Sequence, residues 1–243
     1  MHNGIVHSIE TFGALDGPGT RYVLFLKGCP LRCLFCHNPD TWTMEGGTER
    51  SPEEVVADVL RYKGFYSKGG VTISGGEPML QHDFVKELLI MLRSNNIHTA
   101  LDTAGSIPVS KTSGLIDLTD MLLLDIKSPF GDVFEKITGR PIDNTLDTLR
   151  YCEKTSKRVW IRHVVIPGLT DSEENFRTLG SLLKDLKCVE YVDLLPFHKL
   201  GEYKWHDLGL PYTLTDTPEP DLSILENAVE ILAGYGLKAR YNH

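Results

Sequence analysis

The apolar positions of this 243-residue chain fall into short, β-branched runs that alternate with longer amphipathic stretches. Short apolar runs bounded by turn residues are typical of strands buried on both faces, which need no polar alternation. We therefore predict six strands, at residues 21–28, 70–77, 98–103, 121–127, 158–168 and 191–198.

The stretches between these runs carry helix signals. Ser51 is followed by proline and, three residues later, by Glu54, which is the pattern of a capping box at a helix N-terminus. Gly234 and Gly236 are placed to end the last helix. Apolar residues at helical spacing predict further helices at 82–96, 145–154, 172–186 and 221–236.

Strand and helix alternate six times, which predicts a parallel sheet covered by crossover helices. Right-handed crossovers leave two architectures, a doubly wound sheet and a barrel. The polar residues favour the barrel, because they end many different runs, as a barrel mouth requires. They are Glu77, Asp102, Asp125, Lys127, Arg162 and His198. Six strands rather than eight predict a partial (βα)6 TIM-like barrel, forming one domain over residues 1–243.

Composition and charge narrow the functional classes. A net charge of −8 without a basic stripe argues against nucleic-acid binding, which usually relies on a positive surface. No apolar run approaches the ~20 residues of a membrane span, and the N-terminus lacks the features of a secretory signal. We expect a cytoplasmic monomer. Thiols stay reduced in the cytoplasm, so clustered cysteines there bind metal more often than they form disulfides.

Three of the five cysteines lie in the stretch "KGCPLRCLFCHN", as Cys29, Cys33 and Cys36. Structural zinc needs four ligands, and His37 is a poor fourth because adjacent side chains point apart. The C-x-x-C-H pattern of haem attachment also matches, but it leaves Cys29 unexplained and requires export. Three core cysteines do not suit a polar segment with two prolines, where thiols would be exposed to oxidation.

An iron–sulfur cluster is the fourth interpretation. A [4Fe–4S] cluster normally takes four thiolates, and three would leave one iron open, as in reactive rather than structural metal sites. The predicted cluster loop, residues 28–40, follows the first strand directly and so lies at the barrel mouth. Cys152 and Cys188 occur singly and are predicted to be core residues.

The C-x3-C-x2-C spacing after the first strand, followed by "SGGEP" at the end of the second, resembles the radical S-adenosylmethionine (SAM) superfamily. The flanking segments "LDGPGTRYVLFLKGC", "HTALDTAG", "LLLDIK" and "LLPFHKLGEYKW" are similar to the family of activases that act on pyruvate formate-lyase. The resemblance runs from about residue 4 to the C-terminus and implies the partial (βα)6 fold. Between Cys36 and the helix at Ser51, this chain lacks the ferredoxin-like insertion that is common in activases of other glycyl radical enzymes.

The resemblance implies a reaction on a protein. SAM is cleaved reductively at a [4Fe–4S] cluster to methionine and a 5′-deoxyadenosyl radical, which takes a hydrogen atom from one glycine of pyruvate formate-lyase. The resemblance also implies a flavodoxin or ferredoxin as electron donor.

The resemblance assigns residues to this chemistry as well. Cys29, Cys33 and Cys36 are implied cluster ligands, and Asp16 and Arg162 are implied contacts of the glycine loop. The implied SAM-binding residues are Phe35, Cys36, His37, Gly75, Gly76, Glu77, Asp102, Asp125, Ile126, Lys127 and His198. Gly75 and Gly76 would let backbone carbonyls approach the ammonium group of SAM closely. Asp102 and Thr103 are implied to hold a monovalent cation near the SAM carboxylate.

Several of these residues also have simpler explanations. Asp125 and Lys127 would fit a structural ion pair, and His198 a core histidine. Asp102 would fit a helix cap, and Asp16 a turn residue in the "DGPG" turn; His37 would also fit a surface loop.

Other functions also remain compatible with the residues. They are an activase of another glycyl radical enzyme, a radical SAM enzyme with a small-molecule substrate, and a binding module that carries zinc or a cluster.

Overall fold

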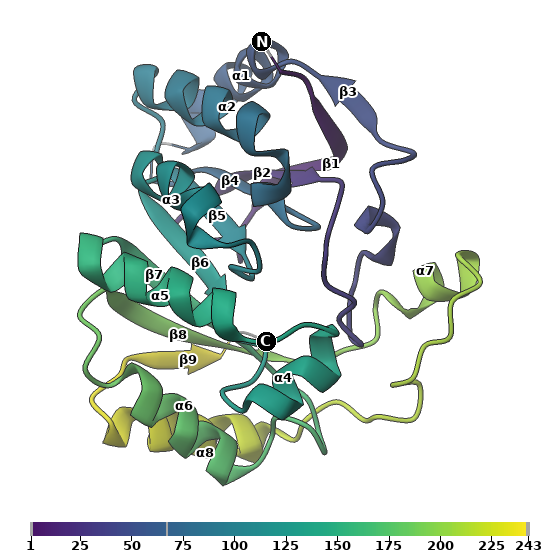
Figure 1. Cartoon of the computed structure of the whole chain (residues 1–243), viewed down its shortest axis with the longest axis vertical. Helices are drawn as coiled ribbons and strands as arrows, with labels where there is room; N and C mark the ends of the chain where they lie inside the picture. Colours follow the sequence, from purple (N-terminus) through teal and green to yellow (C-terminus); the bar gives the residue numbers. More distant parts are fainter. Residues whose placement is uncertain (1, 67, 242–243) are drawn as a thin grey trace.

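A computed structural model describes residues 2–66 and 68–241 of the chain, and nine strands in it form one sheet (Figure 1). The order across the sheet is β3-β1-β2-β4-β5-β6-β7-β8-β9. The strands are β1 (Gly4–Gly13), β2 (Arg21–Leu26), β3 (Thr48–Arg50), β4 (Gly70–Gly75), β5 (Thr99–Thr103), β6 (Met121–Asp125), β7 (Arg158–Val165), β8 (Val189–Pro196) and β9 (Ala239–Tyr241).

The six predicted strands are β2, β4, β5, β6, β7 and β8, and each pairs in parallel with the next one in the sequence. The short strand β9 adds a seventh parallel strand beside β8. Among the described residues the two edge strands, β3 and β9, do not pair with each other. The prediction of a partial barrel is therefore confirmed. This one sheet includes strands from both ends of the described chain.

The predicted runs extend beyond the strands at their C-terminal ends. Glu77, Lys127 and His198 each lie two residues past the last residue of their strand. The chain leaves the sheet at these points and turns into the barrel mouth, where parallel strands place their ligand-binding residues.

Strands β1, β3 and β9 were not predicted. β1 runs antiparallel to β2, and β3 runs antiparallel to β1, so both extend the sheet beyond the first barrel strand. In β1 buried and exposed positions largely alternate, because one side of the strand faces the core and the other faces solvent. The polar residues of this strand interrupt the apolar run that would have signalled it.

Helices follow most of the strands. The capping box is confirmed: the Glu54 amide donates to Ser51 Oγ at 3.2 Å, and the Ser51 amide donates to the Glu54 carboxylate at 2.9 Å. The helices are α1 (Pro52–Arg61), α2 (His82–Ser94), α3 (Val109–Leu118), α4 (Gly131–Thr138), α5 (Asp143–Thr155), α6 (Glu173–Leu183), α7 (Glu202–Asp207) and α8 (Leu222–Gly234). Of these, α3, α4 and α7 were not predicted; α3 is rich in serine, threonine and glycine, which favour helices weakly.

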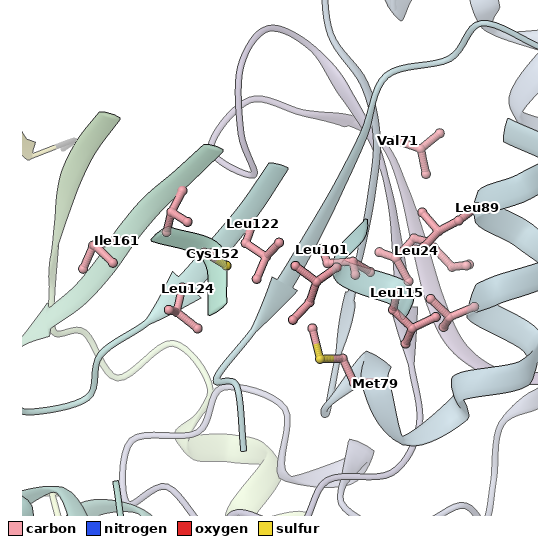
Figure 2. Close-up of a cluster of buried hydrophobic side chains, with 14 of the residues drawn as sticks. Leu24, Val71, Met79, Leu89, Leu101, Leu115, Leu122, Leu124, Cys152 and Ile161 are labelled. Atoms are coloured by element: carbon pink, nitrogen blue, oxygen red, sulfur yellow. The ribbon is translucent and has the colours of Figure 1, made fainter. Parts of the chain in front are cut away.

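The main core lies between the sheet and the helices that cover its outer face (Figure 1). Figure 2 shows Leu101 and Leu122 of neighbouring strands in one cluster with Leu89 of α2 and Leu115 of α3. All four side chains are fully buried. Cys152 and Cys188 belong to the same core, 0% and 5% exposed, as the sequence predicts.

We predict that Leu122→Ala lowers the free energy of unfolding by about 2–5 kcal/mol, because it leaves a cavity in a close-packed core. The matched control is Leu222→Ala at the start of α8, where the leucine is 45% exposed and the loss should stay within about 1 kcal/mol. Anaerobic urea unfolding, followed by circular dichroism, measures both. Equal losses in the two variants would contradict this packing.

Candidate active site

A cavity of about 490 Å³ opens inside the barrel mouth and collects most of the predicted site residues. Its wall is formed by the cluster loop, by the ends of several strands and by the loop before β2. The predicted residues that line it are Asp16, Cys29, Cys33, Phe35, Cys36, His37, Gly75, Gly76, Asp102, Thr103, Asp125, Lys127, Arg162 and His198. Glu77 and Ile126 are the two predicted residues that do not line it.

The backbone of the cluster loop is held from both sides. The Cys29 amide donates to the Trp42 carbonyl at 3.1 Å, which closes the loop at its base. The amides of Arg32 and Leu34 donate to the carbonyls of Thr138 and Ile137 at 2.8 and 3.0 Å. These carbonyls lie at the C-terminal end of α4, so this helix fixes the loop by using carbonyl groups that a helix end leaves unpaired.

The segment around α7 holds the other side of the loop. Trp205 Nε1 donates to the Cys36 carbonyl at 2.8 Å, and its ring packs edge-on against Trp42 at 5.1 Å. Lys204 Nζ donates to Asn38 Oδ1 at 2.8 Å. Figure 1 shows α7 projecting away from the helices on the outer face of the sheet. No sequence pattern predicted this contact, because it joins residues about 170 positions apart.

The three thiols on this loop are largely withdrawn from water. Burial raises the pKa of all three, that of Cys33 to about 12. A bound cationic metal centre would lower these pKa values again, because thiolates bind iron and the iron compensates their negative charge. Within the described residues the thiols share one cavity but form no ready-made site for a single metal ion. Three thiols on one wall, beside open space, fit a cluster with three protein ligands.

The glycine-rich turn after β4 packs directly against the cluster loop. A Cβ atom at Gly76 would lie 2.3 Å from the Gly28 carbonyl oxygen and 3.0 Å from Cys29 Cβ, so no other residue fits there. Gly75 has a φ of +126°, a conformation that favours glycine. The backbone of this turn therefore faces the cavity without side chains.

Glu77 does not contact the cavity through its side chain, contrary to the simplest form of the prediction. It is 1% exposed, and its carboxylate accepts hydrogen bonds from Thr103 Oγ1 at 2.7 Å and from the Met79 and Ala104 amides at 3.2 Å. Ser106 Oγ donates to the same carboxylate. Glu77 thus ties the glycine-rich turn to the end of β5, and burial raises its pKa.

Ile126 is also turned away from the cavity, with its side chain fully buried in the main core. The residues on either side of it, Asp125 and Lys127, line the cavity. Lys127 Nζ donates to Asp125 Oδ2 at 2.7 Å, so the ion pair considered from the sequence is present at the cavity wall. Burial opposes the charge of Lys127, but Asp125 raises its pKa, so Lys127 remains charged. Lys127 also lies 5.2 Å from the centre of the Phe35 ring.

His37 and His198 stack at the rim of the cavity, with ring centres 4.2 Å apart. His37 Nε2 lies 3.2 Å from the His198 carbonyl oxygen, to which it can donate as the neutral tautomer. Burial, and then His198, lower the pKa of His37 to about 4. The pair therefore presents two flat rings to the cavity, of which His37 is neutral at pH 7.

Arg162 lies at the bottom of the cavity and organises the charges there. Its Nη1 is 3.1 Å from Asp102 Oδ2, which also accepts a hydrogen bond from Ser74 Oγ at 2.6 Å. Burial disfavours the guanidinium charge, yet neighbouring carboxylates raise the pKa of Arg162. In decreasing order of effect these are Asp102, Asp125, Asp16 and Asp193. Asp102 Oδ1 and Arg162 Nε are buried without a hydrogen-bond partner among the described residues.

Asp193 and Arg240 were missed by the sequence reasoning, although they complete a row of charges. Asp125, Arg162, Asp193 and Arg240 are successive register partners on β6, β7, β8 and β9, so their signs alternate across four strands. Arg240 Nε and Nη2 both donate to the Asp193 carboxylate. An acid inside the apolar run 191–198 was the signal for Asp193, while nothing indicated that β9 would supply its partner.

Asp16 reaches the same region from the loop between β1 and β2. Thr72 Oγ1 donates to the Asp16 carbonyl at 2.6 Å and fixes the loop against β4. Burial, and then the charge of Asp102, raise the pKa of the Asp16 carboxyl.

Comparison of this sequence with known proteins indicates the family to which the barrel belongs. The sequence model of the radical SAM superfamily matches residues 23–179. Two relatives, both pyruvate formate-lyase-activating enzymes, match nearly the whole chain. The one from Clostridium pasteurianum is 46% identical and covers 91% of this chain and 93% of its own. The one from Streptococcus mutans is 42% identical, and the match covers 94% of this chain and 90% of the relative.

A solved structure agrees with these relatives. It is a domain of pyruvate-formate lyase-activating enzyme from Bacteroides vulgatus, with a TM-score of 0.62 and 26% identity over 72% of this chain and 99% of that one. The chain belongs to the radical SAM superfamily and, within it, to the family of pyruvate formate-lyase-activating enzymes. None of the helices in the described part of the chain is long and apolar enough to span a membrane.

We predict that Asp193→Asn lowers the free energy of unfolding by about 1–3 kcal/mol, because it removes a carboxylate between two arginines. Asp185→Asn on the exposed end of the α6 region serves as control and should change it by less than about 0.5 kcal/mol. Anaerobic urea unfolding measures both. A neutral effect of Asp193→Asn would show that the charge row contributes little to the fold.

Proposed function

We propose that this chain activates pyruvate formate-lyase by generating a radical on one of its glycines, with a [4Fe–4S] cluster and SAM as cofactors. The observation that carries the proposal is 46% identity to an enzyme of that activity over 91% of the chain, with all three expected thiols at one cavity. When bound, the cluster and SAM supply the one-electron chemistry that removes a hydrogen atom from glycine.

The residues of the chain would hold and orient these groups. Cys29, Cys33 and Cys36 are the proposed cluster ligands. The backbone of Gly75 and Gly76 lines the cavity, and its carbonyl groups are the proposed acceptors for the amino group of SAM. The Asp125–Lys127 pair presents an acceptor and a donor to the same cavity, suited to ribose hydroxyls and a carboxylate.

The rim of the cavity suits an aromatic ligand group. Phe35, His37 and His198 line the cavity with flat side chains, and these are proposed contacts for the adenine of SAM. Apolar residues complete the wall and exclude water from the reacting atoms; they are Phe25, Val164, Leu195 and Phe197.

A monovalent cation is proposed at Asp102. Its Oδ1 is buried and has no partner among the described residues, which is the type of oxygen ligand that such an ion needs. Thr103 is a weaker candidate than the sequence indicated, because its hydroxyl donates to Glu77 and accepts from the Gly105 amide.

Asp16 and Arg162 are the proposed anchors of the substrate glycine loop. They lie at the same end of the cavity, and Arg162 keeps Nε free of partners in the described structure. A charged donor beside a charged acceptor can bind the amide and carbonyl groups of a peptide backbone. A flavodoxin or ferredoxin is the proposed electron donor.

The proposed function is tested by mixing the anaerobically reconstituted protein with SAM, a reductant and purified pyruvate formate-lyase. Electron paramagnetic resonance should show a glycyl radical, and the lyase should gain activity. A parallel sample with a different glycyl radical enzyme separates the alternatives. A signal there, with none on pyruvate formate-lyase, would overturn the proposed partner, and SAM cleavage without either would favour a small-molecule substrate.

The cluster ligands can be separated from the core cysteines. Serine substitution of Cys29, Cys33 or Cys36 should remove iron and abolish SAM cleavage, because two thiolates cannot hold the cluster in place. Cys152→Ser and Cys188→Ser are matched controls, since both thiols lie in the core, and should retain iron. Iron analysis and methionine release measure the outcome. Loss of iron in either control would refute the ligand assignment.

Arg162→Lys should reduce the glycyl radical yield about tenfold or more, because lysine keeps the charge and loses the planar fork. SAM affinity should change by less than about threefold. Arg158→Lys is the control on the same strand, where the arginine is exposed and pairs with Glu190. SAM binding and radical yield are measured on each variant. A proportional fall in both quantities would assign Arg162 to the SAM site instead.

A further inference from the structure

A second cavity, of about 310 Å³, lies beside the active site and takes no part in the functions described so far. One wall is the loop of residues 14–20 between β1 and β2, and the other is formed by Trp160 of β7 and Arg240 of β9. It therefore lies between the loop that leads into β2, the first parallel strand, and two strands near the other edge of the sheet, β7 and β9.

The two cavities adjoin at Leu15, which lines both. Of the two residues that follow Leu15, Asp16 lines the larger cavity and Gly17 lines the smaller one. On the facing wall, Arg162 lines the larger cavity and Trp160 the smaller. Side chains two apart point to the same face of a strand and lie ~6.6 Å apart along it. A chain bound beside Asp16 and Arg162 can thus continue past Leu15 into the second cavity.

Arg240 presents a fixed donor to this cavity. Its Nε and Nη2 donate to Asp193, and the guanidinium lies 4.7 Å from the Trp160 ring centre and 5.3 Å from that of Tyr191. Among the described residues its Nη1 has no hydrogen-bond partner. Because Asp193 already balances its charge, the free N–H groups suit a neutral carbonyl oxygen better than an anion.

The opposite wall offers backbone groups. Across the described residues, no amide of the 14–20 loop donates a hydrogen bond to the protein. Gly17 and Gly19 have φ values of +119° and +69°, which favour glycine, and the backbone of both residues lines this cavity. Free main-chain donors on one side and a guanidinium on the other are the features of a site that binds an extended peptide through its backbone.

We propose that the second cavity is a subsite for the peptide segment that flanks the reacting glycine, with Arg240 donating from Nη1 to a main-chain carbonyl of that segment. This inference rests on the proposed function. It extends the substrate site from the glycine to a stretch on one side of it, and makes Arg240 a binding residue outside the reacting centre.

The test compares peptides of different length derived from the glycine loop of pyruvate formate-lyase. A short peptide contains the glycine and its immediate neighbours, and two longer ones add about four residues on one side or the other, ~13 Å of extended chain. Fluorescence anisotropy of labelled peptides, with SAM and the reconstituted protein, gives the dissociation constants without turnover. Only one of the two extensions should tighten binding.

Arg240→Lys should weaken binding of that longer peptide about tenfold, as expected for the loss of one charge-assisted hydrogen bond, and leave the short peptide unchanged. Lysine preserves the charge beside Asp193 and hence the fold. Lys238→Ala is the control, because Lys238 lies near the same Tyr191 ring but lines neither cavity. SAM affinity should be the same in all three proteins.

Equal binding of the longer peptides to wild type and Arg240→Lys would overturn the subsite, as would equal binding of the short and long peptides to wild type. The proposed function fails in a different way, since pyruvate formate-lyase would then gain no radical from the wild-type protein.

Discussion

A buried arginine inside the barrel is the constraint on which the arrangement of the site depends. A guanidinium removed from water is unstable unless carboxylates neutralise it and accept its hydrogen bonds. The charge of Arg162 is balanced by Asp102 at 3.1 Å and by further carboxylates from the neighbouring strands and from the loop before β2, although its Nε has no partner among the described residues. Satisfying one cation therefore fixes the relative positions of β5, β6, β8 and that loop.

This charge cluster also connects regions with different roles. The row from Asp125 to Arg240 begins at the wall proposed for SAM and ends at the open side of the barrel, through which a peptide would enter. Because the signs alternate, every member of the row has at least one neighbour of opposite charge. A closed eight-stranded barrel would place another strand beside β9 and remove the side opening.

The cluster loop follows a different principle, since backbone hydrogen bonds rather than charges hold it. The C-terminal end of α4 accepts from its amides, and Trp205 donates to the carbonyl of Cys36. The thiols thereby reach the cavity on a rigid backbone while their side chains remain available for metal. Rigid support of this kind is what a reactive metal site needs, because small shifts of the ligands disturb the geometry at the open iron.

The sequence by itself determined the alternation of strands and helices, the partial barrel, the three clustered cysteines and most of the residues at its mouth. These features depend on local patterns: apolar runs, a capping box, and polar residues at the ends of strands. Only the tertiary structure showed that Glu77 and Ile126 point away from the cavity, that α4 and α7 brace the cluster loop, and that Asp193 and Arg240 complete a row of charges. Each of these depends on which distant segments meet, as when β9 pairs with β8 or Trp205 reaches Cys36, and such contacts leave no periodic signal in the chain.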